Sequence, residues 1–151
     1  GAVDNERKKL LLVCRGNTCR SLMAEAMAGV RLQQLGIAAT VRSVGTLGIE
    51  GKPPAPRAVI AMRDIGHDIS EHVSRAVTLP IAAAADYLII MQPEHRAFLE
   101  GMSIPLKDKI VALWDTTQNS TPALEELEDF VRCRDQIMAA LERWLPLLAV
   151  S

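Results

Sequence analysis

The sequence has no excess of charge of either sign and no long hydrophobic run near its start. Among its 151 residues, 17 are basic and 18 are acidic. A chain with so small a net charge is not expected to bind nucleic acid or an anionic membrane surface. The apolar run near the N-terminus covers only residues 10–13, which is too short for a signal-peptide core or a membrane span. These absences predict a cytoplasmic protein without nucleic acid or membrane partners.

Cysteine is also scarce. The chain has three cysteines, and two of them lie five residues apart, which makes a poor disulfide framework and favours free thiols. The three histidines show no metal-ligand spacing with these cysteines. The sequence therefore predicts neither a metal ion nor an organic cofactor.

The order of the apolar segments indicates a single α/β domain. We expect residues 1–151 to form one domain, with a flexible tail at residues 1–8. Short apolar runs alternate with segments of helical periodicity, which is typical of a parallel sheet covered by helices on both faces. The expected strands are residues 9–13, 39–44, 87–91 and 110–113, and the expected helices are residues 21–35 and 56–65, a short helix from residue 93 and a long last helix.

The last helix has the clearest pattern. Thr121 can cap its N-terminus, and Pro122 suits the first helical position. Glu125 and Glu126 would then lie at the positive end of the helix dipole. Apolar residues recur on one face of the following segment. The prediction is a long amphipathic helix that begins at Pro122.

A dense group of reactive residues, CRGNTCR, follows the first expected strand. In a parallel sheet, ligands gather at the carboxyl ends of the strands, where the following helix presents free N–H groups. Such a place stabilises a thiolate, so Cys14 is a candidate nucleophile. Arg20 can offer a planar fork to two oxygens of a tetrahedral anion.

Two smaller residues of this segment suit the same chemistry. Gly16 lets backbone amides approach an anion, and Asn17 tolerates a left-handed backbone conformation. The segment therefore predicts a phosphate-binding loop with a nucleophile at its base. The alternative is a buried core thiol at Cys14 and a surface charge at Arg20, which the preceding strand and the following helix disfavour.

The segment VCRGNTCRSLMAE, residues 13–25, resembles the active-site loop of the low-molecular-weight protein tyrosine phosphatases. The resemblance continues in SVGT at residues 43–46, GKPPAPR at 51–57 and GHDISEHVSR at 66–75, and it spans residues 9–113 and, more loosely, the last helix. It implies a flavodoxin-like three-layer sandwich with a four-stranded parallel sheet. It also implies a two-step reaction without metal, in which Cys14 attacks phosphorus and water then hydrolyses the phosphocysteine.

The resemblance also implies roles for individual residues. Arg20 and the loop amides would stabilise the phosphoryl oxygens. A hydrogen-bonded network that fixes the loop and supports the thiolate would consist of Asn17, Ser21, Ser43 and His72. The residues that would bind substrate and phosphate are Arg15, Gly16, Asn17, Thr18, Cys19 and Ser21.

One family feature is absent, namely the Asp-Pro-aromatic turn before the last helix, whose aspartate protonates the leaving group. Its place falls near Pro122. Asp115 is the best substitute for this acid, because Glu125 and Glu126 suit a helix N-terminus for structural reasons alone. General-acid catalysis is typically worth about 10²- to 10⁴-fold in rate. The alternative function is therefore a catalytically weak pseudophosphatase that binds a phosphorylated partner.

The substrate expected from the family is a protein carrying phosphotyrosine, and phosphoarginine is the alternative. Thr18 is similar to the residue at this place in the bacterial protein-arginine phosphatases. Arg15, however, would put a positive charge at the pocket mouth and disfavour a guanidinium substrate. Among the few aromatic residues, only Trp114 is suited to line a phosphotyrosine cleft.

The other two cysteines lead to predictions about redox sensitivity and about packing of the core. The pair Cys14 and Cys19, which the family shares, implies redox sensitivity through a sulfenic acid and then a disulfide; the alternative is that Cys19 only packs. Cys133 is expected in the core of the last helix. No cysteine lies between Cys19 and Cys133, so the second cysteine pair of the related arsenate reductases is lacking and arsenate reduction is not expected.

Overall fold

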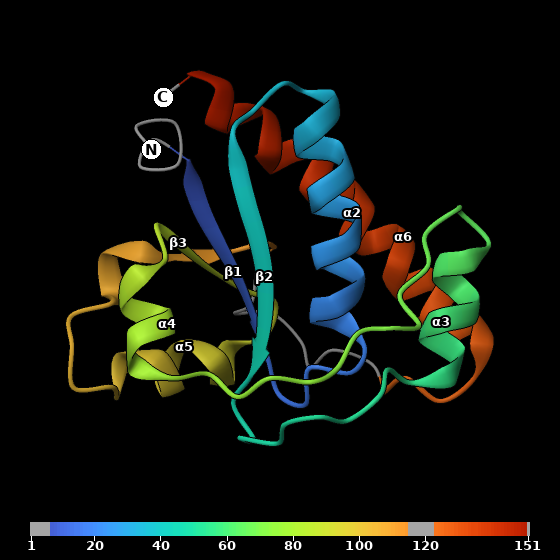
Figure 1. The fold of residues 1–151 in the computed structure, drawn as a ribbon, viewed down its shortest axis with the longest axis horizontal. Coiled ribbons are helices and arrows are strands. Elements are labelled where there is room, and N and C mark those ends of the chain that lie inside the picture. Colours follow the sequence, from blue (N-terminus) through green and yellow to red (C-terminus); the bar gives the residue numbers. More distant parts are fainter. Residues whose placement is uncertain (1–6, 115–122, 151) are drawn as a thin grey trace.

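The computed structural model describes residues 7–114 and 123–150, which contain one four-stranded parallel sheet (Figure 1). The strands lie in the order β2-β1-β3-β4. They are β1 (Lys8–Cys14), β2 (Ala39–Gly45), β3 (Tyr87–Ile90) and β4 (Ile110–Ala112). Each strand end lies within one residue of its predicted place, which confirms the predicted α/β fold.

Helices cover the sheet on both faces, as Figure 1 shows. The helices on one face enclose the larger hydrophobic cluster and are α2 (Arg20–Gln34), α3 (Pro56–Arg63) and α6 (Leu127–Trp144). The smaller cluster on the other face lies under α4 (Leu79–Ala84) and α5 (Pro93–Glu100). The result is a three-layer sandwich in which the sheet is the middle layer.

The central strand β1 is buried on both faces. Leu10 and Leu12 belong to the larger cluster, whereas Leu11 and Val13 belong to the smaller one. All four are at most 3% exposed, and burial of such a side chain is worth roughly 1.5–3 kcal/mol. The strand is therefore held firmly, and Cys14 lies at its carboxyl end.

The N-terminal boundary and one helix differ from the sequence-based predictions. The strand β1 begins at Lys8, within the expected tail, and the half-buried Arg7 donates from Nη2 to the carbonyl of Ala39 at 2.8 Å. Helix α4 was not predicted, because six residues are too few to show a helical period. Thr78 caps it by accepting a hydrogen bond from the amide of Ile81 at 3.3 Å.

The predicted start of the last helix is wrong. Helix α6 begins at Leu127, and Ala123 to Glu126 are not helical. A capping box fixes this start. The Asp129 carboxylate accepts a hydrogen bond from the Glu126 amide at 2.8 Å, and the Glu126 side chain accepts one from the Asp129 amide. The expected cap, Thr121, lies outside the described residues.

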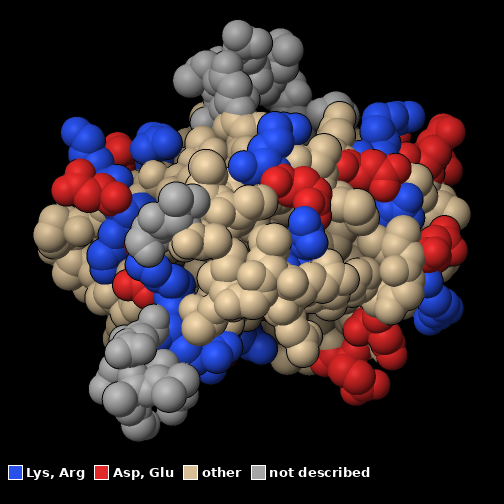
Figure 2. All heavy atoms as spheres, turned by 90° about the horizontal axis from the view of Figure 1, so that it is seen from above, with Lys and Arg blue, Asp and Glu red and all other residues tan. Residues whose placement is uncertain are grey.

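Lys and Arg side chains are interspersed with Asp and Glu over the end of the molecule at which β1 and β2 begin, with uncharged surface between them (Figure 2). Within residues 7–114 and 123–150, no helix has the length and apolarity needed to cross a membrane.

Candidate active site

The loop between β1 and α2, residues 14–20 and hereafter the Cys14 loop, lies at the carboxyl end of the sheet (Figure 1). Cys14 is 6% exposed, and its Sγ lies at the base of the loop. The amide of Asn17 donates to Sγ at 3.2 Å, and Ser21 Oγ lies 2.7 Å from Sγ. Two polar groups therefore converge on this sulfur, one from the loop main chain and one from the first turn of α2.

Asn17 organises the loop from its interior. Its φ of 56° lies in the left-handed region, and its side chain is fully buried. Nδ2 donates to Ser21 Oγ at 2.8 Å, while Oδ1 accepts from the amide of Arg75 at 2.9 Å and lies 3.2 Å from His72 Nε2. Because an amide oxygen only accepts, the His72 proton in this contact is on Nε2.

Ser43 and His72 are linked to a residue that the sequence did not single out. Ser43 Oγ donates to Glu25 Oε1 at 2.8 Å, and no hydrogen bond within the described residues joins Ser43 to Asn17, Ser21 or His72. This corrects the expected four-residue network. Burial lowers the pKa of His72, and the charge of nearby Glu25 opposes that shift. Glu25 is four residues after Ser21 on α2, so the helical period was the signal that could have found it.

Main-chain bonds hold the Cys14 loop against its neighbours. The amides of Thr46 and Leu47 donate to the carbonyls of Cys14 and Arg15 at 2.8 and 3.0 Å. The amide of Ala55 donates to the carbonyl of Thr18 at 3.0 Å. Segments far apart in the sequence therefore fix the path of the loop without using its side chains.

Gly45 permits this close packing. A Cβ at this position would lie 2.7 Å from the carbonyl oxygen of Arg15, which is closer than side chains tolerate. The Gly45 amide also donates to the carbonyl of Arg75 at 2.7 Å, so the backbone is held on that side as well. Glycine is required here because the Cys14 loop packs too closely for a side chain, and not because the backbone has a positive φ.

Arg20 begins α2 and lies against α6. It borders a small cavity of about 30 Å³ together with Cys133 and Asp129. Burial raises the pKa of the Cys133 thiol, and Arg20 opposes the shift through its charge and a hydrogen bond. Cys133 is thus both buried, as expected, and in contact with the guanidinium of the Cys14 loop.

Cys19 precedes Arg20 at the N-cap position of α2 and is half-buried. Burial raises the pKa of its thiol, and nearby Cys14 raises it further. Its thiol is therefore protonated at neutral pH, unlike the nucleophile that the loop requires.

The remaining predicted site residues differ in their exposure. Arg15 is exposed, whereas Gly16 and Thr18 are half-buried within the loop. Trp114 is half-buried and packs against the larger hydrophobic cluster. Asp115 lies outside the described residues. In the part of the chain that the structure describes, no group of three or more histidine, cysteine and acidic side chains could hold a metal ion.

Comparison with known proteins gives a consistent result. A sequence model described as low molecular weight phosphotyrosine protein phosphatase matches residues 9–150. A probable low molecular weight protein-tyrosine-phosphatase, EpsP, of Ralstonia nicotianae is 29% identical over 141 residues, covering 92% of this chain and 94% of its own length. Arsenate reductase 1 of Staphylococcus epidermidis is 31% identical over 139 residues, and the match covers 91% of this chain and 95% of the reductase.

A solved structure is similar over nearly the whole chain. It is a mutant of the YwlE arginine phosphatase with a phosphorylated active site serine, with a TM-score of 0.83 and 25% identity. The match covers 93% of this chain and 95% of that one. The likeness is thus one of overall fold across nearly the full length of both chains.

Proposed function

The chain belongs to the low molecular weight phosphotyrosine protein phosphatase family, and we propose that it removes phosphate from a protein side chain through a covalent intermediate on Cys14. It is thus a cysteine-dependent phosphatase. The observation that carries the assignment of Cys14 is the convergence of the Asn17 amide and Ser21 Oγ on its sulfur.

The reaction has two steps. The Cys14 thiolate attacks phosphorus, the P–S bond forms, and the P–O bond to the side chain breaks. Water then attacks phosphorus, the P–S bond breaks, and the thiolate and inorganic phosphate are released. Ser21 donates to the sulfur when it carries negative charge, which favours departure of the thiolate in the second step.

Arg20 and the loop amides stabilise the phosphoryl oxygens in this proposal. The guanidinium presents a planar fork, and the amides of Arg15, Gly16 and Thr18 provide further donors at the N-terminus of α2. Asn17, with His72, holds the loop in shape through its buried side chain.

We assign the leaving-group acid to Asp115. The described carboxylate that shares a cavity with Arg20 is Asp129, but its Oδ2 accepts hydrogen bonds from the amides of Glu125 and Glu126. These bonds lower the pKa of Asp129, so it stays ionised and is a poor proton donor. Its position is explained by helix capping.

The substrate class that we propose first is phosphotyrosine, with phosphoarginine as the alternative. The exposed charge of Arg15 favours a substrate with negative charge beside the phosphoryl group and disfavours a guanidinium. The similarity to an arginine phosphatase supports the alternative. Matched peptides carrying either phosphoresidue distinguish the two through their kcat/KM values.

A series of aryl phosphates with increasingly poor leaving groups tests the mechanism. The blank is Cys14→Ser, the acid variant is Asp115→Asn, and Asp108→Asn is the matched control at an exposed position. We expect Asp115→Asn to lose activity about 10²-fold or more on poor leaving groups and little on good ones. An equal loss across the series would remove Asp115 as the acid.

Two other outcomes would redirect the assignment. Reduced protein that binds phosphate but shows no turnover dependent on Cys14 would favour the phosphate-binding pseudophosphatase. Reduction of arsenate with a thiol reductant, at a rate above that of Cys14→Ser, would favour the arsenate reductase activity named for one relative.

A further inference from the structure

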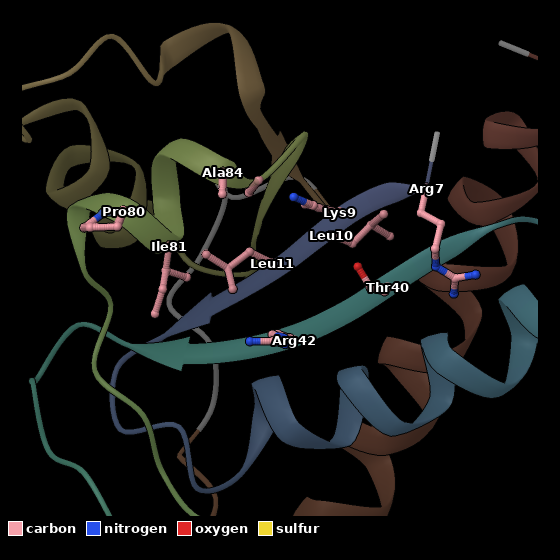
Figure 3. A pocket seen from close by; sticks show the side chains of 10 residues that line it. Arg7, Lys9, Leu10, Leu11, Thr40, Arg42, Pro80, Ile81 and Ala84 are labelled. Carbon is pink, nitrogen blue, oxygen red and sulfur yellow. The ribbon is translucent and has the colours of Figure 1, made fainter. Parts of the chain in front are cut away.

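A cavity of about 570 Å³ lies on the face of the sheet that carries α4, along the first halves of β1 and β2 (Figure 3). The parallel register pairs Lys9 with Thr40 and Leu11 with Arg42, so these side chains share this face. The cavity, hereafter the α4 cavity, contains no residue of the Cys14 loop. It is a separate feature of the molecule.

The hollow arises from the lengths of the neighbouring elements. The strand β2 is an edge strand, and α4 has only six residues. Small side chains, Ala84 and Ala85, face the cavity from the end of α4, so the outer half of the sheet is left without a covering layer. Thr40 and Arg42 are exposed as a result.

The inner wall is apolar. Figure 3 shows Ile81 of α4 and Leu11 of β1 pointing into the space between the helix and the strands. Leu11 is 3% exposed and belongs to the smaller hydrophobic cluster, against which Ile81 also packs. The apolar part of a ligand bound here would pack against this smaller hydrophobic cluster.

The rim is basic. Arg7, Lys9 and Arg42 border the cavity, and none of the acidic side chains that the structure describes does. Among the described carboxylates, none forms an ion pair with these three residues. The adjacent Asp86 uses Oδ2 to accept from the main-chain amide of Lys9 at 2.7 Å.

Within residues 7–114 and 123–150, these three positive side chains therefore have no ion-pair partner. Arg7 is oriented by its 2.8 Å bond to the Ala39 carbonyl at one end of the cavity.

We propose that the α4 cavity binds a small amphipathic anion, in which an apolar body lies against Leu11 and Ile81 and a single carboxylate or phosphate head contacts Lys9 and Arg42. The cavity volume is within the range of small-molecule sites, about 300–1,000 Å³. The combination of an apolar wall with few converging polar groups is typical of such sites. This inference does not depend on the function proposed for the Cys14 loop.

The test is a calorimetric titration of the whole chain with octanoate and with octylphosphonate, neither of which the enzyme can hydrolyse as a phosphate ester. Micromolar orthovanadate, a phosphate analogue, is present throughout to occupy the Cys14 loop. We expect both probes to bind, octanol and octylamine to bind far more weakly, and the stronger of the two anions to identify the head group.

A pair of double variants locates the binding. Lys9→Gln with Arg42→Gln should weaken both anionic probes about tenfold or more, because two charge-assisted contacts are lost. Lys107→Gln with Arg143→Gln makes the same charge change at exposed positions elsewhere and should leave the affinities within about twofold.

Three results would overturn the proposal. They are the absence of binding by either anion, equal weakening in the two double variants, and binding of octylamine as tight as that of octanoate. A chain that fails to dephosphorylate any substrate but binds octanoate through Lys9 and Arg42 would refute the proposed function and leave this site standing.

Discussion

Cys14 Sγ and Ser21 Oγ lie 2.7 Å apart at the base of the Cys14 loop, although the two residues are seven positions apart in sequence. The first turn of α2 brings the hydroxyl back to the end of β1. Ser21 also accepts from Asn17 Nδ2 at 2.8 Å, which leaves its own proton directed toward the sulfur.

Ser21→Ala should lower kcat about 10- to 100-fold, because a hydrogen bond to a charged group is lost. Alkylation of Cys14 by iodoacetamide at mildly acidic pH should slow as well. The matched control is Ser103→Ala, at an exposed position remote in sequence from the loop. An unchanged kcat with normal folding would show that Ser21 does not support the thiolate.

Gly45→Ala should destabilise the fold by about 2 kcal/mol or more and lower activity, because the new Cβ would lie 2.7 Å from the Arg15 carbonyl oxygen. Gly29→Ala is the contrasting variant. Gly29 lies in the middle of α2 on its exposed side, with no atom within 4 Å of the place that a Cβ would take. Alanine there should raise the free energy of unfolding by about 0.5–1 kcal/mol. Urea unfolding measures both, and similar effects of the two changes would contradict the close-approach argument.

Glu25→Gln should lower the pKa of His72 further. Burial already lowers it, and the Glu25 charge is the largest opposing influence. The amide retains an acceptor for Ser43 Oγ, so the fold should be kept. Titration of the His72 ring by NMR measures the shift. An unmoved or raised value would mean that the Glu25 charge does not reach the ring.

The free energy of unfolding should fall as pH is lowered below about 6.5, the ordinary pKa of histidine. Burial first, and then the charge of Arg20, lowers the pKa of His95 in the folded chain, while Glu94 opposes the shift. The unfolded chain consequently binds a proton that the folded chain does not, until the pH drops past the folded pKa. His72 adds a shift in the same direction.

His95→Asn tests the contribution of this one ring. The melting temperature of the variant should fall less between neutral and acidic pH than that of the wild type. For each protein the fall is measured from its own melting temperature at mildly alkaline pH, where histidine is neutral in both the folded and the unfolded state. A pH dependence equal to that of the wild type would exclude His95 as a source.

Peroxide should inactivate the enzyme reversibly. The Cys14 thiolate would be oxidised to a sulfenic acid, and the Cys19 thiol would displace water to form a disulfide that dithiothreitol reduces. Cys19→Ser should lose most of this recovery, because the sulfenic acid is then open to further oxidation. Cys133→Ala is the control that removes a buried thiol, and equal recovery in all three proteins would exclude the disulfide.

The sequence predicted the elements that local pattern determines. The apolar runs located the four described strands, and the family resemblance implied that Asn17 and Ser21 support the Cys14 loop. The contacts of Glu25 and Gly45 were missed, because they depend on how strands and helices far apart in the chain are brought together. The parallel register that places Gly45 beside Cys14 is not readable from either segment alone.

The start of the last helix was mispredicted for a different reason. Threonine is a preferred N-cap residue and glutamate is not, so the sequence favoured Thr121 over Glu126. The reciprocal bonds between Glu126 and Asp129 decide the start of α6.

The amides of Thr46, Leu47 and Ala55 hold the Cys14 loop, and any residue except proline can supply them. Leu47 is 50% exposed although its amide is bonded to the loop. Its side chain is therefore free to vary while the geometry of the nucleophile stays constant. Directed evolution of substrate preference can therefore begin at Leu47, where the side chain can be exchanged while the main-chain bond to the loop is kept.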